Sequence, residues 1–491
     1  MVLISYTSGS TVFTNAMWVT AGSPTVVELG TGWTEIGLRA FYQDTTITSI
    51  HIPASVTAIG NYAFLDCATL TTITFATGST LATIGYSAFE STAITSVIIP
   101  ASVVSIGSQA FYQIAALTTV TFATGINLAT IGSYVFSNSG ITSIAIPASV
   151  TEIGYNAFYN TTTLTSVAFA AGSGLLTIKG SAFELTAITS IAIPASVTAI
   201  EGDAFKFIDD LTTVTFATGS ELATIGNNAF QETALTSIII PASVTHLGNL
   251  AFYNIATLTS VAFATGSELA TIGNRAFEAT AITAIAIPAS VTHLGDRAFY
   301  ACASLTSVTF TGDSLLATIT GTIHFANSGL STFTAPSSVV ALFGVTAGSN
   351  QTVSGKTGVT VIQSIPYSSG STIFTTSAWT TAGSPTDVTL GEGWTSIGLQ
   401  AFWNTALNSI ILPASLTEIG ASAFYDTALT SITIPASVTS IGNNAFDSCV
   451  NLTTVTFAAD SVLESIGNYA IQSTALTSIT IPASVTEIGN Y

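Results

Sequence analysis

The stretch AITSVIIPASVVSIGSQAF (Ala93–Phe111) decides the fold of this chain. Ile94, Val97 and Ile99 follow L-x-x-L-x-L spacing, and outward-pointing positions alternate with them. Such period-2 alternation in a β-branched run predicts a short strand. Pro100 ends this strand, because a residue without an N–H cannot continue a central ladder.

The residues after this proline complete one coil of the chain. We expect Val103 and Ile106 to point back into the interior, Gly107 to permit a sharp turn, and Ala110 and Phe111 to fill the far side. One such coil has too few apolar side chains to offset the conformational entropy that its ordering costs. Its stability must therefore come from neighbouring coils stacked on both open sides.

The same phrase recurs along the chain at a fixed period. Its proline returns every 47 residues, at Pro53, Pro100, Pro147, Pro194, Pro241 and Pro288. From Phe64 onward, the spacing of its phenylalanine alternates between 25 and 22 residues: Phe41, Phe64, Phe89, Phe111, Phe136, Phe158, Phe183, Phe205, Phe230, Phe252, Phe277 and Phe299. A fixed period of this length predicts a solenoid in which each 47-residue unit is two unequal coils.

The charge balance excludes two classes of partner. Charged residues make up 6% of the chain, and 25 acidic against 6 basic residues give a formal net charge of −19. A nucleic-acid-binding protein needs Lys and Arg to meet phosphates, and an anionic membrane surface would repel this chain, so we expect neither partner. Its apolar runs are shorter than the roughly 18 residues of a spanning helix, so we expect no membrane insertion. The first residues, MVLISYTSGSTVF, show no basic region before an apolar block, so no signal peptide is visible there.

A longer repeat indicates two modules. The Trp-bearing segment that begins at Ile4 returns from Ile365 at a constant offset of 361 residues, and we interpret each copy as an N-terminal cap. The predicted domains are a cap at 1–33, a solenoid at 34–345, a polar linker at 346–364, a second cap at 365–394 and a second solenoid at 395–491. Because its last phrase, IPASVTEIGNY, stops before the Ala-Phe pair, we expect the second solenoid to be truncated. The open edge of its final coil is then able to make end-to-end contact with another chain.

The spacing described above, followed by IPxxVTxIGxxAF and then xxCxxL, resembles the BspA-like class of leucine-rich repeat surface proteins. The last motif matches at 64–70, 299–305 and 446–452, and the resemblance covers residues 34–344 and 395–491. It implies an α/β-type leucine-rich repeat solenoid dominated by β-structure. This would be a right-handed curved stack of coils with one parallel β-sheet face and short turns or 3-10 segments on the other side. It also implies an extracellular or cell-surface protein that binds host proteins or other cells.

Three sets of residues suggest metal or redox chemistry, and each has a simpler interpretation. Cys67, Cys302 and Cys449 share a coil position that elsewhere holds Ile or Thr, which indicates core packing; neither zinc-ligand spacing nor a disulfide is expected. His246 and His293 repeat one position two coils apart, which is about 10 Å and too far to share a metal. Acidic residues in related turns are predicted to be solvated carboxylates rather than calcium ligands: Glu221, Glu268, Asp313 and Asp460.

No constellation in the sequence points to an enzyme. SGKTG at Ser354–Gly358 lacks the earlier glycine and the following helix of a phosphate loop. Four scattered histidines supply no nucleophile–base pair, so we expect no catalytic residue, no cofactor and no metal. N-x-S/T sequons begin at Asn160, Asn350 and Asn451, and a Thr-rich chain produces these by chance.

The outward positions of the predicted strands form the candidate binding face. It is expected to be an uncharged strip of hydroxyls, methyls and small side chains, with these hydroxyl-bearing residues: Ser49, Thr72, Thr74, Ser96, Thr119, Thr121, Ser143, Ser166, Ser190, Thr213, Thr215, Ser237 and Ser260. Solvated strands commonly carry Ser and Thr, so a purely structural scaffold is one interpretation. Our main hypothesis is an adhesive or partner-binding surface protein. It would hold a protein or glycan by weak, multivalent contacts, because large aromatic residues are missing from the strip.

An alternative hypothesis is recognition of an ordered lattice, such as ice or crystalline polysaccharide. Thr72 with Thr74, Thr119 with Thr121, and Thr213 with Thr215 form regular Thr-x-Thr pairs that resemble those of some β-solenoid ice-binding proteins. The pairs fall on alternate coils, and the sheet that the resemblance implies is curved. Both features favour partner binding over lattice recognition.

Overall fold

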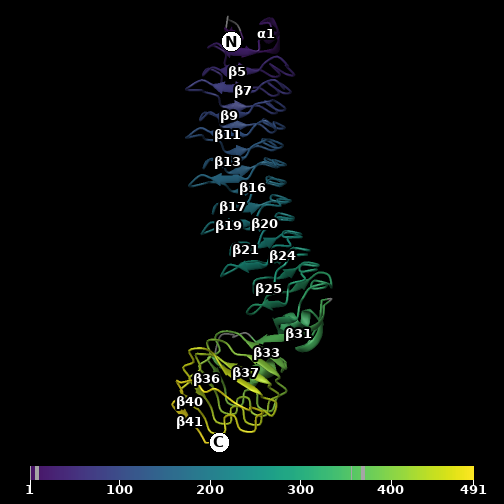
Figure 1. Ribbon diagram of the computed structural model, residues 1–491, viewed down its shortest axis with the longest axis vertical. Coiled ribbons are helices and arrows are strands. Elements are labelled where there is room, and N and C mark those ends of the chain that lie inside the picture. The colour runs from purple at the N-terminus through teal and green to yellow at the C-terminus, as the bar shows by residue number, and fades with distance from the viewer. Residues whose placement is uncertain (1, 6–9, 355, 366–370, 491) are drawn as a thin grey trace. The chain divides into compact units, whose positions relative to one another are not determined.

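The computed structural model describes residues 2–5, 10–354, 356–365 and 371–490. It divides into two compact units. Unit 1 comprises Met1–Ile282 with Arg297–Phe299, and unit 2 comprises Thr283–Asp296 with Tyr300–Tyr491. Each unit is a stack of β-rich coils, which confirms the predicted leucine-rich repeat solenoid, and Figure 1 shows the coils of unit 1 in purple to teal. The division falls inside the predicted first solenoid, where the sequence pattern does not change.

The first side of each coil in unit 1 is a strand of four residues. These strands are β5 (Ser49–Ile52), β7 (Thr72–Phe75), β9 (Ser96–Ile99), β11 (Thr119–Phe122), β13 (Ser143–Ile146), β15 (Ser166–Phe169), β17 (Ser190–Ile193), β19 (Thr213–Phe216), β21 (Ser237–Ile240) and β23 (Ser260–Phe263). All the paired ones are parallel, as predicted. Their inward residues, such as Val97 and Ile99 at 2% and 0% exposure, form the core. We call the outward side chains of β5 to β23 the sheet face.

Pairing along the sheet face is complete within doublets of strands and weak between them. β5 with β7, β9 with β11, β13 with β15, β17 with β19, and β21 with β23 each pair over four residues. By contrast, β11 and β13 share one residue pair, and the ladder is interrupted after β7, β15 and β19. Each weak junction follows a strand of the 25-residue coil, in which a longer turn (ATGS, ATGI or AAGS) replaces the proline turn.

The second side of each coil is a ladder of two-residue strands that sequence analysis did not resolve. It contains β4 (Glu35–Ile36), β6 (Ala58–Ile59), β8 (Thr83–Ile84), β10 (Ser105–Ile106), β12 (Thr130–Ile131), β14 (Glu152–Ile153), β16 (Thr177–Ile178), β18 (Ala199–Ile200), β20 (Thr224–Ile225), β22 (His246–Leu247) and β24 (Thr271–Ile272). One residue of each pair points inward, such as Ile131 at 0% exposure. We call this the short ladder.

The third side of each coil consists of turns that bond directly to the next coil. Gln109 N–H donates to the Ser133 carbonyl at 2.9 Å, and Phe111 N–H donates to the Val135 carbonyl at 3.0 Å. Gln109 has a left-handed φ of 61°, a conformation that recurs along these turns and points alternate N–H groups toward the following coil. The described residues contain no 3-10 segment, so this side is built from turns alone. We call its outward side chains the turn face.

The glycine of IGxxAF is required by the close approach of coils. A Cβ on Gly107 would lie 2.7 Å from backbone atoms of both Gly85 and Tyr86. The φ of Gly107 is outside the left-handed region, so the expected sharp turn is not the reason for this glycine. Any side chain here would push consecutive coils apart.

The phenylalanines of the AF pair form a continuous stack in the core of unit 1. From Phe158 to Phe252, each ring is fully buried, with centroids of neighbouring rings 5.2 to 5.4 Å apart and interplanar angles of 8° or less. Offset stacking of this kind adds to the free energy that burial itself contributes. The stack therefore ties each coil to both of its neighbours.

The N-terminal segment of unit 1 extends this core. It contains β1 (Val2–Ile4), β2 (Val12–Phe13), α1 (Asn15–Thr20) and β3 (Val26–Leu29), with β1 paired to β3 and β3 to β5. Trp18 from α1 is 1% exposed, packs against Phe41 at 4.8 Å between ring centroids, and donates its indole N–H to Asp44 at 2.7 Å. Partial burial alone would raise the pKa of the Asp44 carboxyl. The hydrogen bonds that it accepts, from Trp18 among others, outweigh burial and hold the pKa below its ordinary value.

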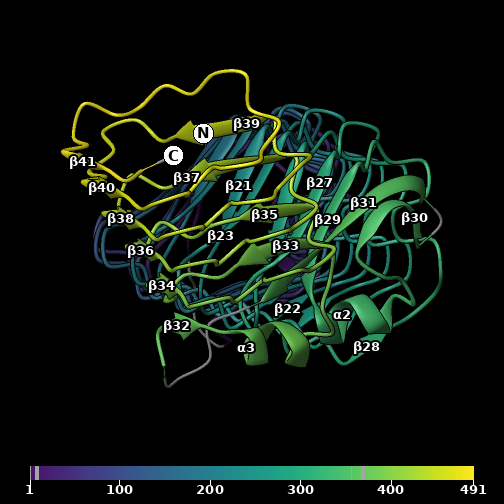
Figure 2. The same cartoon turned by 90° about the horizontal axis from the view of Figure 1, so that it is seen from below.

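Unit 2 has the same coil architecture as unit 1. Its elements are β25 (Ala284–Ile287), β26 (His293–Leu294), β27 (Ser307–Phe310), β28 (Thr318–Ile319), β29 (Thr332–Pro336), α2 (Ser337–Leu342), β30 (Gly348–Val353), β31 (Lys356–Ile365), β32 (Ile373–Phe374), α3 (Thr376–Thr381), β33 (Asp387–Leu390), β34 (Ser396–Ile397), β35 (Ser409–Ile411), β36 (Glu418–Ile419), β37 (Ser431–Ile434), β38 (Ser440–Ile441), β39 (Thr454–Phe457), β40 (Ser465–Ile466) and β41 (Glu487–Ile488). Figure 2 shows β34, β36, β38, β40 and β41 along one side of this unit and β33, β35 and β37 along another. The two ladders of the coil are therefore present here too.

The polar linker predicted at 346–364 is wrong for the described residues 348–354 and 356–364. β31 lies in the sheet between β29 and β33, pairing in parallel with both, and β30 folds back on it as an antiparallel hairpin. Val359 and Val361 are fully buried, and Gln363 and Ile365 are 7% and 6% exposed. Because Thr360, Gln363 and Ser364 are interspersed with the apolar residues, the mean composition resembles that of a linker although the segment is a rung of the sheet. The second Trp-bearing segment, predicted as a cap at 365–394, consequently places β33 between β31 and β35 instead of covering an open end.

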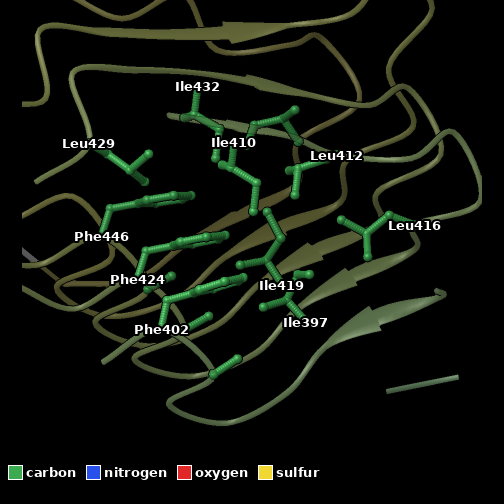
Figure 3. Packing of buried hydrophobic residues seen from close by; sticks show 14 of the residues in the cluster. Ile397, Phe402, Ile410, Leu412, Leu416, Ile419, Phe424, Leu429, Ile432 and Phe446 are labelled. Atoms are coloured by element: carbon green, nitrogen blue, oxygen red, sulfur yellow. The ribbon is translucent and has the colours of Figure 1, made fainter. Parts of the chain in front are cut away.

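Figure 3 shows how the core of unit 2 is packed. The rings of Phe402, Phe424 and Phe446 lie parallel, with centroids 5.1 and 5.2 Å apart, and Ile397 and Ile419 pack beside them. All five side chains are fully buried. The same aromatic stack therefore organises both units.

Candidate binding face

The predicted binding residues lie together on the sheet face. Ser49 is half-buried, and the other twelve are exposed: Thr72, Thr74, Ser96, Thr119, Thr121, Ser143, Ser166, Ser190, Thr213, Thr215, Ser237 and Ser260. Strand register aligns them directly, for example Ser96 with Thr119 and Ser190 with Thr213. The structure therefore places these side chains in two neighbouring columns, with Thr74, Thr121 and Thr215 in the second one.

Two neighbouring columns of hydroxyls have different tasks. The threonine immediately before β7, β11, β15, β19 and β23 donates its hydroxyl to the backbone of the preceding coil, as Thr71 does to the Thr48 carbonyl at 3.1 Å and Thr212 does to the Thr189 carbonyl at 3.2 Å. Within the described residues, no such bond engages the hydroxyl of Thr213 on the sheet face. The first column stabilises the stack, and the second is available to a ligand.

The sheet face is neutral over its whole described length. Among the outward residues of β5 to β23 there is no Asp, Glu, Lys or Arg. His51 is the titratable exception, and its Nδ1 lies 2.9 Å from the Thr74 hydroxyl. A partner that matches this surface must itself be uncharged where it touches.

A groove opens in the sheet face where the ladder between β7 and β9 is interrupted. It has a volume of about 490 Å³, and Thr72, Thr74, Phe75, Ser96 and Ile98 are among its lining residues. Ile98 is 64% exposed, which is unusual for such a large apolar side chain. The missing backbone pairing leaves space between the two strands, and their side chains form the walls.

A second groove repeats the first at the interruption between β19 and β21. It has a volume of about 550 Å³, and its walls include Thr213, Thr215, Phe216, Ser237 and Ile239. Each of these residues follows its counterpart in the first groove by 141 residues, which is three 47-residue periods. Ile239 is also 64% exposed. Unit 1 thus carries two chemically equal grooves on one face.

Aromatic residues border these grooves, and sequence analysis did not identify these aromatic residues as part of the candidate face. Phe75 and Phe216 stand at the ends of their strands and are half-buried, whereas Ile99 and Ile240 at the matching position of the alternate coil are fully buried. The sequence signal was present, since Phe follows the outward Thr in TITF and TVTF. The L-x-x-L-x-L spacing alone places that position in the core, as it does for Ile99.

The register also bears on the Thr-x-Thr pairs. Thr74 is paired with His51, Thr121 with Ile98 and Thr215 with Ala192. One coil (β9) therefore separates the first two Thr-x-Thr pairs, and three coils (β13, β15 and β17) separate the second from the third. They do not form adjacent ranks of threonine.

The cysteines occupy buried structural positions. Cys67, Cys302 and Cys449 are free and fully buried, as predicted. The Cys67 thiol donates to the Phe41 carbonyl at 2.8 Å, and Thr161 at the same coil position donates its hydroxyl to the equivalent Phe136 carbonyl at 3.0 Å. Burial raises the pKa of the Cys67 thiol to about 12, so the reactive thiolate is suppressed.

The other candidate sites remain dispersed. His246 is exposed and His293 half-buried, and the turn carboxylates at 221, 268, 313 and 460 are exposed. Among the residues that the structure describes, no three His, Cys, Asp or Glu side chains gather as metal ligands would. In the SGKTG segment, Ser354 accepts hydrogen bonds from the backbone N–H groups of His324 and Phe325, so it closes a coil. Gly355 of that segment lies outside the described residues.

A membrane-spanning helix was not expected from the sequence. None of the helices in the described ranges has the length and apolarity to cross a bilayer.

Comparisons with known proteins give the family. The model of the BspA type leucine rich repeat region (6 copies) matches over residues 34–165, 129–259, 223–343 and 372–491. No curated protein matches this chain. Several solved structures are similar to it, each at low identity.

A leucine-rich repeat protein from Bacteroides ovatus is 20% identical, with 93% of this chain and 78% of that one covered and a TM-score of 0.33. A leucine rich cell surface protein from Faecalibacterium prausnitzii is 23% identical, covering 64% and 93%, with a TM-score of 0.32. The pneumococcal vaccine antigen PcpA is 16% identical, covering 92% and 85%, with a TM-score of 0.35. With the family model matched over most of its length, this chain belongs to the BspA-type leucine-rich repeat family.

Proposed function

We propose that this chain is a non-enzymatic surface scaffold that binds a protein or glycan partner through the sheet face of unit 1. Repeat proteins commonly bind through such extended surfaces. The observation that carries the proposal is the pair of equal grooves at the β7–β9 and β19–β21 junctions. Each groove offers hydroxyls, one exposed isoleucine and the edge of one phenylalanine, without a formal charge.

This chemistry suits a neutral ligand that has polar and apolar faces. The hydroxyls of Thr72 and Ser96 can donate to and accept from amide or sugar oxygens. The apolar side chains of Ile98 and Phe75 supply contact area that the hydroxyls lack. An uncharged polypeptide segment and an uncharged oligosaccharide both present such faces, so both belong to the proposed partner class.

The spacing of the grooves favours multivalent binding. Three 47-residue periods are six coils, and at about 4.8 Å per coil the grooves lie about 29 Å apart. A partner with a repeating structure can occupy both grooves, and the second contact then benefits from a high effective concentration. Weak individual contacts therefore suffice for firm attachment to a densely covered surface.

The proposal includes an extracellular or cell-surface location, which membership of the BspA-type family supports. It is tested by the accessibility of an epitope tag on intact cells of the source organism. Antibody labelling without permeabilisation is the expected result. Labelling that requires permeabilisation would contradict the location without affecting the binding proposal.

The binding proposal is tested by charge substitution with a matched control. Thr72→Lys with Thr213→Lys places a cation in each groove, whereas Thr83→Lys with Thr224→Lys places the same charges on the short ladder of the same coils. All four threonines are exposed. The probe is an array of purified extracellular proteins and neutral oligosaccharides.

We expect the wild-type chain to bind at least one component of this array. The groove variant should lose at least tenfold in affinity, which corresponds to about 1.4 kcal/mol. The short-ladder variant should stay within twofold of wild type. Equal losses in both variants, or no loss in the groove variant, would rule out the sheet face as the binding surface.

A further inference from the structure

A second surface of unit 1, the turn face, carries a strip of tyrosines. Seven of the 14 tyrosines of the chain lie between residues 40 and 178: Tyr42, Tyr62, Tyr86, Tyr112, Tyr134, Tyr155 and Tyr159. The rings of Tyr62 and Tyr86 meet edge to face with centroids 5.3 Å apart, and those of Tyr112 and Tyr134 do so at 6.2 Å. Tyr86 is 39% exposed, Tyr134 38% and Tyr155 51%. These rings are therefore held in place by neighbouring coils and still open to solvent.

At one end of the strip, a cation of the chain itself lies on the tyrosines. The guanidinium carbon of Arg39 is 5.3 Å from the centre of the Tyr42 ring and 5.3 Å from the centre of the Tyr62 ring. Tyr42 belongs to the same coil as Arg39 and Tyr62 to the next. One arginine is thus accommodated between rings from consecutive coils, which is a favourable cation–π geometry.

The other end of the strip repeats this arrangement with a lysine. Lys179 Nζ lies 5.8 Å from the centre of the Tyr155 ring. It also forms ion pairs with Glu201 at 2.9 Å and Glu152 at 3.6 Å. The turn face therefore holds a cation by combining an aromatic ring with nearby carboxylates.

The middle of the strip has the same rings and no cation of its own. Between Arg39 and Lys179 the sequence contains no Lys or Arg. Tyr86, Tyr112 and Tyr134 lie in this interval, and Glu90 occupies the same coil position as Tyr112 on the preceding coil. Consecutive coils are about 4.8 Å apart, so a carboxylate stands next to the ring.

We propose that the strip from Tyr86 to Tyr134 binds arginine side chains of a partner polypeptide. The planar guanidinium stacks on aromatic faces and is more weakly hydrated than an ammonium, so arginine fits better than lysine. Tyrosine and arginine are also the residues that contribute most to binding at protein interfaces. The net charge of −19 attracts a basic partner toward this surface. This surface is independent of the sheet face and of any ligand bound there.

The test measures binding of labelled octa-arginine to the full chain by fluorescence anisotropy at about 0.15 M salt, where long-range Coulomb attraction is largely screened. Octalysine is the charge-matched probe, and chitohexaose is the neutral one. The variants are Tyr112→Ser with Tyr134→Ser, and Glu90→Gln. The matched control is Tyr253→Ser, which removes a half-buried tyrosine at the Tyr112 position of a coil outside the strip. Circular dichroism checks that each variant is folded, and Tyr112→Phe keeps the ring if the serine variant does not fold.

We expect octa-arginine to bind at least fivefold more tightly than octalysine. The double tyrosine variant should bind octa-arginine at least tenfold more weakly than wild type. The affinity for octa-arginine should fall threefold or less in Glu90→Gln, and twofold or less in Tyr112→Phe and Tyr253→Ser. Equal affinities of the two cationic peptides would overturn the proposal, because they indicate charge attraction alone. Unchanged binding in the double tyrosine variant, tighter binding of chitohexaose than of octa-arginine, or no binding of octa-arginine would overturn it as well. None of these results depends on the sheet face, so they leave the binding scaffold to be judged by its own test.

Discussion

Removing one ring from the phenylalanine stack tests how strongly consecutive coils depend on each other. Phe205 is fully buried, and its ring lies 5.3 Å from the ring of Phe183 and 5.3 Å from that of Phe230. A buried phenylalanine removes about 200 Å² from water, worth about 5 kcal/mol at about 25 cal/mol per Å². The alanine side chain retains part of this, and measured Phe→Ala changes in cores cost about 3–5 kcal/mol. We therefore expect Phe205→Ala to destabilise unit 1 by about 4 kcal/mol.

The assay is amide hydrogen exchange followed by mass spectrometry, because stacked coils need not unfold in one step. Protection should fall most in the coils that contain Phe183, Phe205 and Phe230, and less with distance along the stack. Ile239→Ala is the control, since Ile239 is 64% exposed and its truncation should cost less than about 1 kcal/mol. A loss below about 1 kcal/mol for Phe205→Ala would refute the reasoning that the ring stack joins the coils.

Three further outcomes follow from single positions. The free energy of unfolding of Cys67→Thr in urea should stay within about 1 kcal/mol of wild type, because Thr161 occupies the same coil position and makes the same hydrogen bond. A loss of more than about 2 kcal/mol would contradict the equivalence of Cys and Thr at this position. His324 is fully buried, and burial lowers its pKa from 6.5, opposed in part by the Asp296 carboxylate. The neutral form is favoured on folding, so thermal stability should fall as the pH drops from 7 to 5, by at most about 1.4 kcal/mol per pH unit, and His324→Leu should reduce this slope. Gly107→Ala should destabilise unit 1 by more than about 1 kcal/mol because its Cβ would meet backbone at 2.7 Å, and a neutral result in thermal melts would show that the coils can separate there.

Much of this architecture could be predicted from the sequence, because each coil repeats the same apolar residue types at the positions that face the core. Val97, Ile99 and Phe111 are buried as their spacing indicated, and Pro100 ends β9. The short ladder was missed because Ser105–Ile106 is too brief for alternation to be recognised.

Other features depend on how neighbouring coils pack against each other, and the sequence of one repeat does not show this packing. The grooves arise where β7 and β9 fail to pair, and that depends on how a longer turn displaces the next strand. The hydrogen bonds between the turns of consecutive coils rely on residues with a left-handed φ, such as Gln109. Because these residues are not glycines, the sequence does not indicate this conformation. The tyrosine strip is assembled from different positions on successive coils, so no fixed spacing in the sequence reveals it.

The central functional claim is that two equal grooves act together on one partner surface. The most direct measurement is dissociation of the wild-type chain, Thr72→Lys, Thr213→Lys and the double variant from a sensor densely coated with the array component that binds most tightly. Blocking either groove removes the benefit of simultaneous contact. Each single variant should therefore dissociate at least tenfold faster than wild type, and the two single variants should dissociate at similar rates. The double variant should show no measurable retention. Single variants that dissociate like wild type, or a double variant that is still retained, would contradict binding through the paired grooves.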